Sequence, residues 1–326
     1  MTMSTFQRYT LCLRACLLAA AVAAAGSAAA QTFPSRPLTI IVPYAAGATD
    51  QQARQMAEIA SRELGQTIVV ENREGAGGMI GANFVASSKP DGHTILYGAP
   101  AVITVAPLLG QAPYGYDDLK ALARANIIPH LLAARADAPF KTLPELVAYA
   151  KANPGKVTFG SPGNGTAVHL AGEAFAEAAG IELSHVPYRG VAPAITAAAG
   201  GFVDLVLGAP GPINPQVDSG RLRALAQFGE ERTDELSSVP TLKEEGVDLA
   251  LRADFGFFVP KDTPEDAMER LQAALKTAIE SDAFRKSVTA ALSSPAFLPA
   301  DEYQKVVDDE YAVYSNVVPK LSLGSK

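Results

Sequence analysis

The sequence lacks tryptophan and contains only two cysteines, Cys12 and Cys16, among its 326 residues. Both cysteines lie in the first 30 residues, which also hold two arginines, an uncharged apolar run and a final stretch of small residues. That pattern is typical of a secretory signal peptide. We therefore predict a signal peptide over residues 1–30. The mature chain then has no cysteine, which excludes disulfides, thiolate metal sites and a cysteine nucleophile.

Long hydrophobic runs and positive charge are also scarce in the rest of the chain. No later stretch reaches the roughly 20 apolar residues that cross a bilayer. A lipoprotein signal is disfavoured as well, because the apolar run of the signal peptide follows Cys16, whereas in a lipoprotein it precedes the modified cysteine. Without Arg8 and Arg14 the chain has 25 basic and 34 acidic residues, a formal charge of −9. This balance argues against nucleic acid or an anionic membrane as a partner.

Histidine, another common metal ligand, occurs only four times, at widely separated positions. No Glu-x-x-His spacing brings any of them together, so a zinc site is disfavoured. We expect no metal and no cofactor.

The composition that remains, 48% hydrophobic and 19% charged, predicts a globular protein. Short β-branched runs such as 39–42, 67–70, 94–97 and 157–159 alternate with helical patterns such as 50–64, and this order favours α/β architecture with parallel sheets. About 296 residues is near the size at which one core divides into two, so two domains are expected. Thr263 and Pro264 resemble the cap and first turn of a later helix.

Two loops, 44–50 and 160–166, join a predicted strand to a predicted helix through small residues. Small residues let a ligand approach the backbone, and the unpaired N–H groups at a helix start attract an anion. Each loop is therefore a candidate carboxylate or phosphate site. The simpler interpretation is that Thr49, Asp50 and Thr166 only cap helices; we assign Asp50 to holding the loop and Thr49 to the ligand.

Eight collinear motifs resemble the receptor family of tripartite tricarboxylate transporters, also called Bug receptors. The most specific is the run VENREGAGGMIGA at 70–82, followed by KPDGHT at 89–94. The others span 150–156, 159–170, 185–194, 200–204, 220–226 and 239–241. The resemblance covers the predicted mature chain almost from end to end.

The resemblance implies a periplasmic solute-binding protein, type II-like, with two α/β domains around a ligand cleft and a mainly parallel sheet flanked by helices in each. Carried onto this sequence, 31–130 and 253–326 would form domain 1 and 131–252 domain 2, with crossings near 130–134 and 251–255. It further implies a non-enzymatic receptor, expected to be a monomer, that captures a small carboxylate for the membrane subunits of a tripartite tricarboxylate transporter.

The family's ligand loops correspond to the two loops above, so the resemblance carries ligand contacts onto both. Candidate ligand-binding residues are Tyr44, Ala45, Ala46, Gly47, Ala48, Thr49, Ser161, Gly163, Asn164, Gly165, Thr166, Arg189, Gly208, Ala209 and Phe255. Arg189 is included because a guanidinium can hold a carboxylate bidentately, although such an arginine more often pairs with protein acids.

Three departures from the family pattern bear on the ligand. The first loop lacks the usual second glycine and is one residue shorter. The strand at 205–207 runs into Gly208 and Ala209 without the acidic residue that would pair with an amino group, which favours a dicarboxylate or an aromatic carboxylate over an amino acid. Phe255 stands as an apolar wall where the family often has tryptophan.

Two other functions compete with the receptor. The glycines at 75–81 follow a strand, but their spacing does not match the dinucleotide-binding pattern, and a tight turn into a helix explains them. An exported hydrolase could use Ser161 with His169 and an acid, yet the chain has no G-x-S-x-G elbow around that serine.

Overall fold

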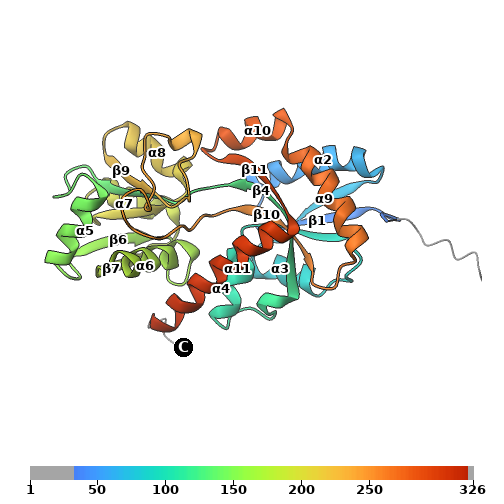
Figure 1. Ribbon diagram of the computed structural model, residues 1–326, viewed down its shortest axis with the longest axis horizontal. Helices are drawn as coiled ribbons and strands as arrows, with labels where there is room; N and C mark the ends of the chain where they lie inside the picture. Colours follow the sequence, from blue (N-terminus) through green and yellow to red (C-terminus); the bar gives the residue numbers. More distant parts are fainter. Residues whose placement is uncertain (1–32, 322–326) are drawn as a thin grey trace, which may run out of the picture.

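The computed structural model describes residues 33–321, which form two lobes connected by extended segments (Figure 1). The predicted signal peptide, with Cys12 and Cys16, lies outside the described residues. Each lobe is built on one β-sheet with helices on both faces. The predicted α/β fold class is therefore confirmed.

The first sheet has the strand order β11-β4-β10-β3-β1-β2. Strands β1, β2 and β3 are mutually parallel, whereas β10 is antiparallel to β3 and β4, and β11 to β4. The strands are β1 (Leu38–Val42), β2 (Ile68–Asn72), β3 (Thr94–Gly98), β4 (Leu119–Ile127), β10 (Phe255–Pro260) and β11 (Ser294–Pro299). Its helices are α2 (Ala48–Leu64), α3 (Met79–Ala86), α4 (Ala101–Leu108), α9 (Glu265–Ile279), α10 (Asp282–Thr289) and α11 (Ala300–Val317).

The second sheet has the order β7-β6-β8-β5-β9, in which β6 is parallel to β7 and β8, and β5 is antiparallel to β8 and β9. The strands are β5 (Leu131–Arg135), β6 (Val157–Ser161), β7 (Leu183–Pro187), β8 (Leu205–Gly208) and β9 (Leu222–Gln227). The helices are α5 (Leu143–Ala152), α6 (Ala167–Ala179), α7 (Val191–Ala199) and α8 (Pro210–Asp218). Two of the five strand pairs in the first sheet and two of the four in the second are parallel, so both sheets are mixed. The expected mainly parallel pairing holds only within β1–β3 and within β6–β8.

The hydrophobic pattern explains the elements that were predicted. Every residue of β1 except Thr39 is buried, and α2 buries Ala53, Met56, Ala57, Ala60 and Leu64 at helical spacing. Gly65 ends α2 in the left-handed conformation, as expected of a C-terminal glycine. The expected cap of α9 was wrong: the helix begins after Pro264, and the Thr263 hydroxyl donates to the carbonyl oxygen of Pro260 instead.

The chain passes between the sheets along two segments that lie side by side. Residues 128–130 connect β4 to β5, and residues 251–254 lead back into β10. The amide of Ala253 donates to the carbonyl oxygen of Ile128 (2.8 Å), and Pro129 forms an antiparallel bridge with Arg252. His130 is buried at this crossing, and burial lowers its pKa to about 4.

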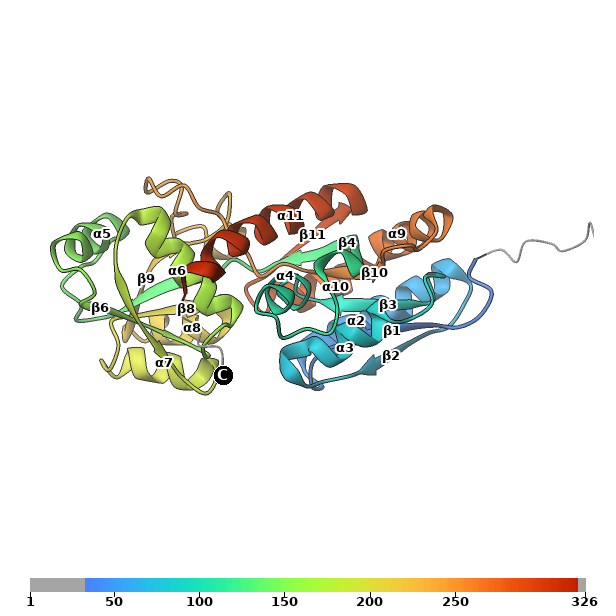
Figure 2. The same cartoon turned by 90° about the horizontal axis from the view of Figure 1, so that it is seen from below.

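Helix α11 makes a third connection between the lobes (Figure 2). Tyr303 and Val307 near its start pack in the core of the first lobe, whereas Tyr314 and Val317 near its end pack with the core of the second. Eighteen residues of helix span about 27 Å, enough to reach from one core to the other.

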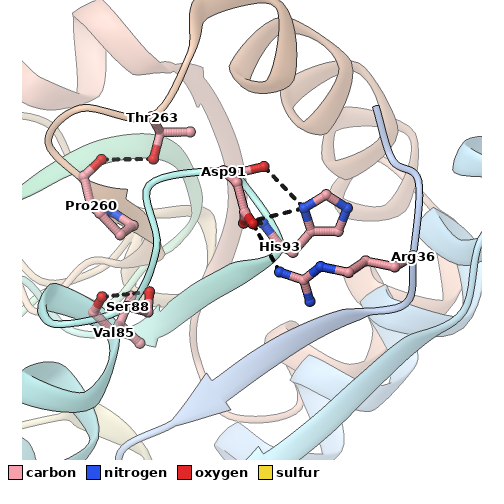
Figure 3. A network of polar contacts seen from close by, with 7 residues as sticks. All are labelled: Arg36, Val85, Ser88, Asp91, His93, Pro260 and Thr263. Atoms are coloured by element: carbon pink, nitrogen blue, oxygen red, sulfur yellow. Dashed lines mark hydrogen bonds and ion pairs between the residues drawn. The ribbon is translucent and has the colours of Figure 1, made fainter. Parts of the chain in front are cut away.

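The motif at 89–94 has a structural task at the amino end of β3 (Figure 3). The Asp91 carboxylate accepts hydrogen bonds from Arg36 (2.9 Å) and from the amide of His93 (3.0 Å). Partial burial alone would raise the pKa of Asp91, but the His93 amide and the Arg36 guanidinium lower it. The network ties the segment before β1 to the turn before β3, at the end of the sheet opposite the predicted ligand loops.

Candidate functional site

A cavity of about 570 Å³ lies between the carboxyl ends of the parallel strands of the two lobes. Residues that follow β1, β2 and β3 line one side, and the start of α6, after β6, lines the other. Ligand sites of α/β proteins favour this edge of a sheet. The lining comprises Tyr44, Ala76, Gly77, Met79, Ala99, Ala101, Val102, Val105, Ala106, Leu109, Gln111, Asn164, Gly165, Thr166, Ala167 and Val168.

The first predicted loop follows β1 and leads directly into α2. Ala45, Ala46, Gly47 and Ala48 are exposed, and Gly47 is the N-cap with an extended backbone (φ 173°) that any residue can adopt. Thr49 lies inside the first turn of α2 and is not a cap. Within residues 33–321, the amides of 48–50 donate no hydrogen bond, so three N–H groups of this helix start are free.

Polar and aromatic contacts fix Tyr44 at the edge of the cavity. Its carbonyl oxygen accepts from the Asn72 side chain (3.0 Å), and its hydroxyl accepts from the amide of Ala99 (3.2 Å). The Phe255 ring packs edge-on against it with the ring centroids 6.1 Å apart. Burial raises the pKa of Tyr44 to about 12, so its hydroxyl stays protonated at physiological pH.

Asp50 is buried at the start of α2 and pairs with Arg54 one turn later (3.0 Å). Arg54 also donates to Asn72, the residue that holds the Tyr44 carbonyl. The Asp50 carboxylate is thereby turned to its own helix, in keeping with the structural task assigned to it from the sequence.

The second predicted loop follows β6 and is held by its own side chains. Thr166 caps α6, because its hydroxyl oxygen accepts from the amide of His169 (3.3 Å) while the hydroxyl donates to the carbonyl oxygen of Gly163 (2.9 Å). Among the described residues, the amides of Asn164, Ala167 and Val168 have no hydrogen-bond partner. The simpler interpretation of Thr166 as a helix cap is correct. The three residues with free amides, Asn164, Ala167 and Val168, all line the cavity.

Two stacked histidines support this loop from behind. His169 accepts a hydrogen bond from the amide of Gly165 on Nδ1 (3.1 Å), so it supports the loop structurally. Its ring stacks on His185 with the centroids 3.8 Å apart. Burial, with a smaller contribution from His169, lowers the pKa of His185 to about 4.

Ser161 is fully buried, and its hydroxyl contacts neighbouring protein groups. Its Oγ lies 2.6 Å from Nε2 of His185, accepts from the amide of Gly163 (3.1 Å) and lies 3.2 Å from the carbonyl oxygen of Gly163. The serine therefore contacts His185, not His169 as a hydrolase triad was expected to use. A hydroxyl closed off from the cavity offers no nucleophile, and the geometry gives the hydrolase alternative no support.

Of the fifteen sequence-predicted residues, Tyr44, Asn164, Gly165 and Thr166 line the cavity, and the other eleven lie outside its lining. Arg189 follows β7 and is exposed. The amide of its neighbour Tyr188 donates to the carbonyl oxygen of Ser161 (2.9 Å). This bond holds the loop after β7 beside the loop after β6. Gly208 ends β8 and is buried, and Ala209 is the N-cap of α8.

Helix α4, which was not predicted from the sequence, lies beside the second lobe in Figure 2. Its residues form one wall of the cavity. Val102, Val105 and Leu109 of this segment face the start of α6, and Val105 packs in the core of the second lobe. The signal was available: residues 101–109 are an almost wholly apolar run directly after a predicted strand. No Asp, Glu, Lys, Arg or His lines the cavity. Within residues 33–321, no group of three or more potential metal ligands is close enough to hold an ion.

Comparison with known proteins identifies the family. Residues 52–323 match the family described as "Tripartite tricarboxylate transporter family receptor". The chain belongs to this family. A curated relative from Cupriavidus necator, named as the UPF0065 protein in the gbd 5' region, is 37% identical over 319 residues, covering 94% of this chain and 95% of its own. The resemblance drawn from the motifs is thus confirmed.

Solved structures of family receptors share the fold. A TctC solute-binding protein from Polaromonas, solved without ligand, is 31% identical with a TM-score of 0.82, covering 89% of this chain and 100% of that one. MatC from Rhodopseudomonas palustris with bound malate (29% identity, TM-score 0.67, coverage 88% and 100%) and R. palustris Rpa4515 with adipate (28%, 0.70, 88% and 97%) are also similar.

Receptors of this family are periplasmic solute-binding proteins. Among the helices of the described part of the chain, none has both the length and the apolar character that crossing a bilayer requires.

Proposed function

We propose that this receptor binds one small carboxylate between its lobes and presents it to the membrane subunits of a tripartite tricarboxylate transporter. The observation that carries the proposal is the pair of helix starts with free amides. The start of α6 lines the cavity, and the start of α2 follows Tyr44, which also lines it. Such amides and the positive end of the helix dipole favour an anion. The malate and adipate in two relatives of known structure support a carboxylate as that anion.

The proposed contacts are mainly backbone groups. The free amides of 48–50 and of Asn164, Ala167 and Val168 would hold the carboxylate, while Tyr44, which packs on Phe255, forms an apolar edge. Backbone amides suit a chain whose net charge repels an anion, since they bind the carboxylate at short range without a counter-charge. The proposal includes no catalytic residue, cofactor or metal, a monomeric state, and export through the signal peptide at 1–30.

Calorimetric titration of the mature protein with a panel of carboxylates tests this function. We expect one-to-one binding of at least one carboxylate and no conversion of it, because the cavity offers amides but no nucleophile. The methyl ester and the amide of the same compound serve as matched neutral controls and are expected to bind at least tenfold more weakly. A neutral sugar or a cation as the best ligand would contradict the proposal.

We also propose that residues 31–130 with 253–326 move as one domain against 131–252. The paired crossings at 128–130 and 251–254 are the natural hinge, and a ligand that contacts both lobes stabilises a closed form by its differential contacts. Small-angle scattering is expected to give a smaller radius of gyration at saturating ligand. An unchanged radius would mean that the lobes do not close on binding.

A further inference from the structure

The cavity wall beyond the helix starts is apolar. Val102 and Val105 of α4 are each 5% exposed, and Leu109 and Val168 are half-buried around the remaining space. The Cδ1 atom of Leu109 approaches Gly165 so closely that a Cβ there would lie 3.0 Å from it. The face of α4 and the first turn of α6 therefore form one continuous apolar surface next to the free amides.

Few polar side chains of this wall can serve a buried anion. The Thr166 hydroxyl donates to the carbonyl oxygen of Gly163, whereas the Tyr44 hydroxyl accepts from the amide of Ala99 and keeps its own O–H as a donor. Gln111 and Asn164, the other two polar side chains of the lining, are exposed. A second carboxylate buried against α4 would meet no cation and, among the partly buried side chains, a single donor, the Tyr44 hydroxyl. Burying a charge with so little compensation is strongly unfavourable.

We propose that the ligand is a monocarboxylate with an apolar, aromatic tail, and that Leu109 and Val168 determine this specificity. The inference rests on the proposed function, since it places the carboxylate at the start of α6 and the tail against α4. A cavity of about 570 Å³ lies within the range of roughly 300–1,000 Å³ of small-molecule sites and leaves room for a ring. The proposal decides between the two ligand classes that the sequence left open.

Calorimetry with 3-phenylpropionate and adipate tests the inference. Both compounds carry a carboxylate at one end, and at the other end the first has a phenyl ring and the second has another carboxylate. We expect 3-phenylpropionate to bind at least tenfold more tightly than adipate. Leu109→Lys is the decisive variant: it places a cation beside the tail, at the C-terminal end of α4 where positive charge is tolerated. It is expected to weaken 3-phenylpropionate at least tenfold and to strengthen adipate.

Ile80→Lys is the matched control, since Ile80 is 53% exposed and lies outside the cavity lining. It is expected to leave both affinities unchanged. Adipate binding as tightly as 3-phenylpropionate to the unchanged protein would overturn the inference while leaving the carboxylate receptor standing. The inference would also be overturned if the Leu109→Lys variant had the melting temperature of the unchanged protein and kept the same preference for 3-phenylpropionate over adipate. If no carboxylate in the wider panel binds, the proposed function itself is wrong and the inference with it.

Discussion

Replacing Gly163 with valine is expected to weaken carboxylate binding about ten- to a hundredfold. Gly163 has φ +145°, a conformation that a β-branched residue reaches only at a cost of about 1–3 kcal/mol. Its amide and carbonyl also bind the side chains of Ser161 and Thr166, so a changed backbone path at this position moves the whole loop. Calorimetry with the best carboxylate measures the loss.

Gly155→Val is the matched control for backbone strain. Gly155 also has a positive φ, +67°, but lies in the turn before β6, at the opposite end of the strand from the ligand loop. We expect it to lower stability with little change in affinity. Equal affinities for the Gly163→Val variant and the unchanged protein would show that the loop at 161–166 does not recognise the ligand.

The second large effect is expected at Gly172, in the middle of α6. In an exposed helix, alanine in place of glycine stabilises by roughly 0.5–1 kcal/mol. Here a Cβ atom would lie 2.4 Å from Cε2 of Phe159, a ring that is 1% exposed. Overpacking of this kind costs about 1–3 kcal/mol, so we expect Gly172→Ala to lower the free energy of unfolding by about 2 kcal/mol.

Far-UV circular dichroism during chemical denaturation measures this change, since the chain has no tryptophan to report it by fluorescence. Gly115→Ala is the control, because a Cβ there meets only a carboxylate oxygen of Asp118 at 3.7 Å; its effect is expected to stay within about 0.5 kcal/mol. A Gly172→Ala protein more stable than the unchanged chain would show that Phe159 has room to move and does not brace the loop that follows it.

Residue patterns along the sequence predicted the helices, strands and caps whose formation depends on neighbouring residues. The apolar spacing of α2 and its terminal Gly65, the buried β1, and the cap of α6 at Thr166 all follow from residues close in sequence. The two loops were found in the same way, because a strand, small residues and a helix start are consecutive along the chain.

Contacts between distant residues could not be predicted in this way. The pairing of Ser161 with His185 joins neighbouring strands, and the stack of His185 on His169 depends on how α6 lies over them. Helix α11 shows an amphipathic pattern, but nothing local says that its two ends pack against different lobes. The apolar run of α4 could have been predicted from the sequence. Its place in the site could not, because the cavity forms only where α4 meets the start of α6 in the second lobe.

Backbone amides at the start of α6 are proposed to hold the carboxylate. A ¹H–¹⁵N correlation spectrum, recorded while a binding carboxylate is added, tests it in one titration because backbone amides and the arginine Nε–H group both appear. We predict that the largest downfield shifts occur at the amides of Asn164, Ala167 and Val168, the unpaired donors of this loop. A large shift at Nε of Arg189, with those three amides unmoved, would contradict the claim and assign the carboxylate to a side-chain clamp.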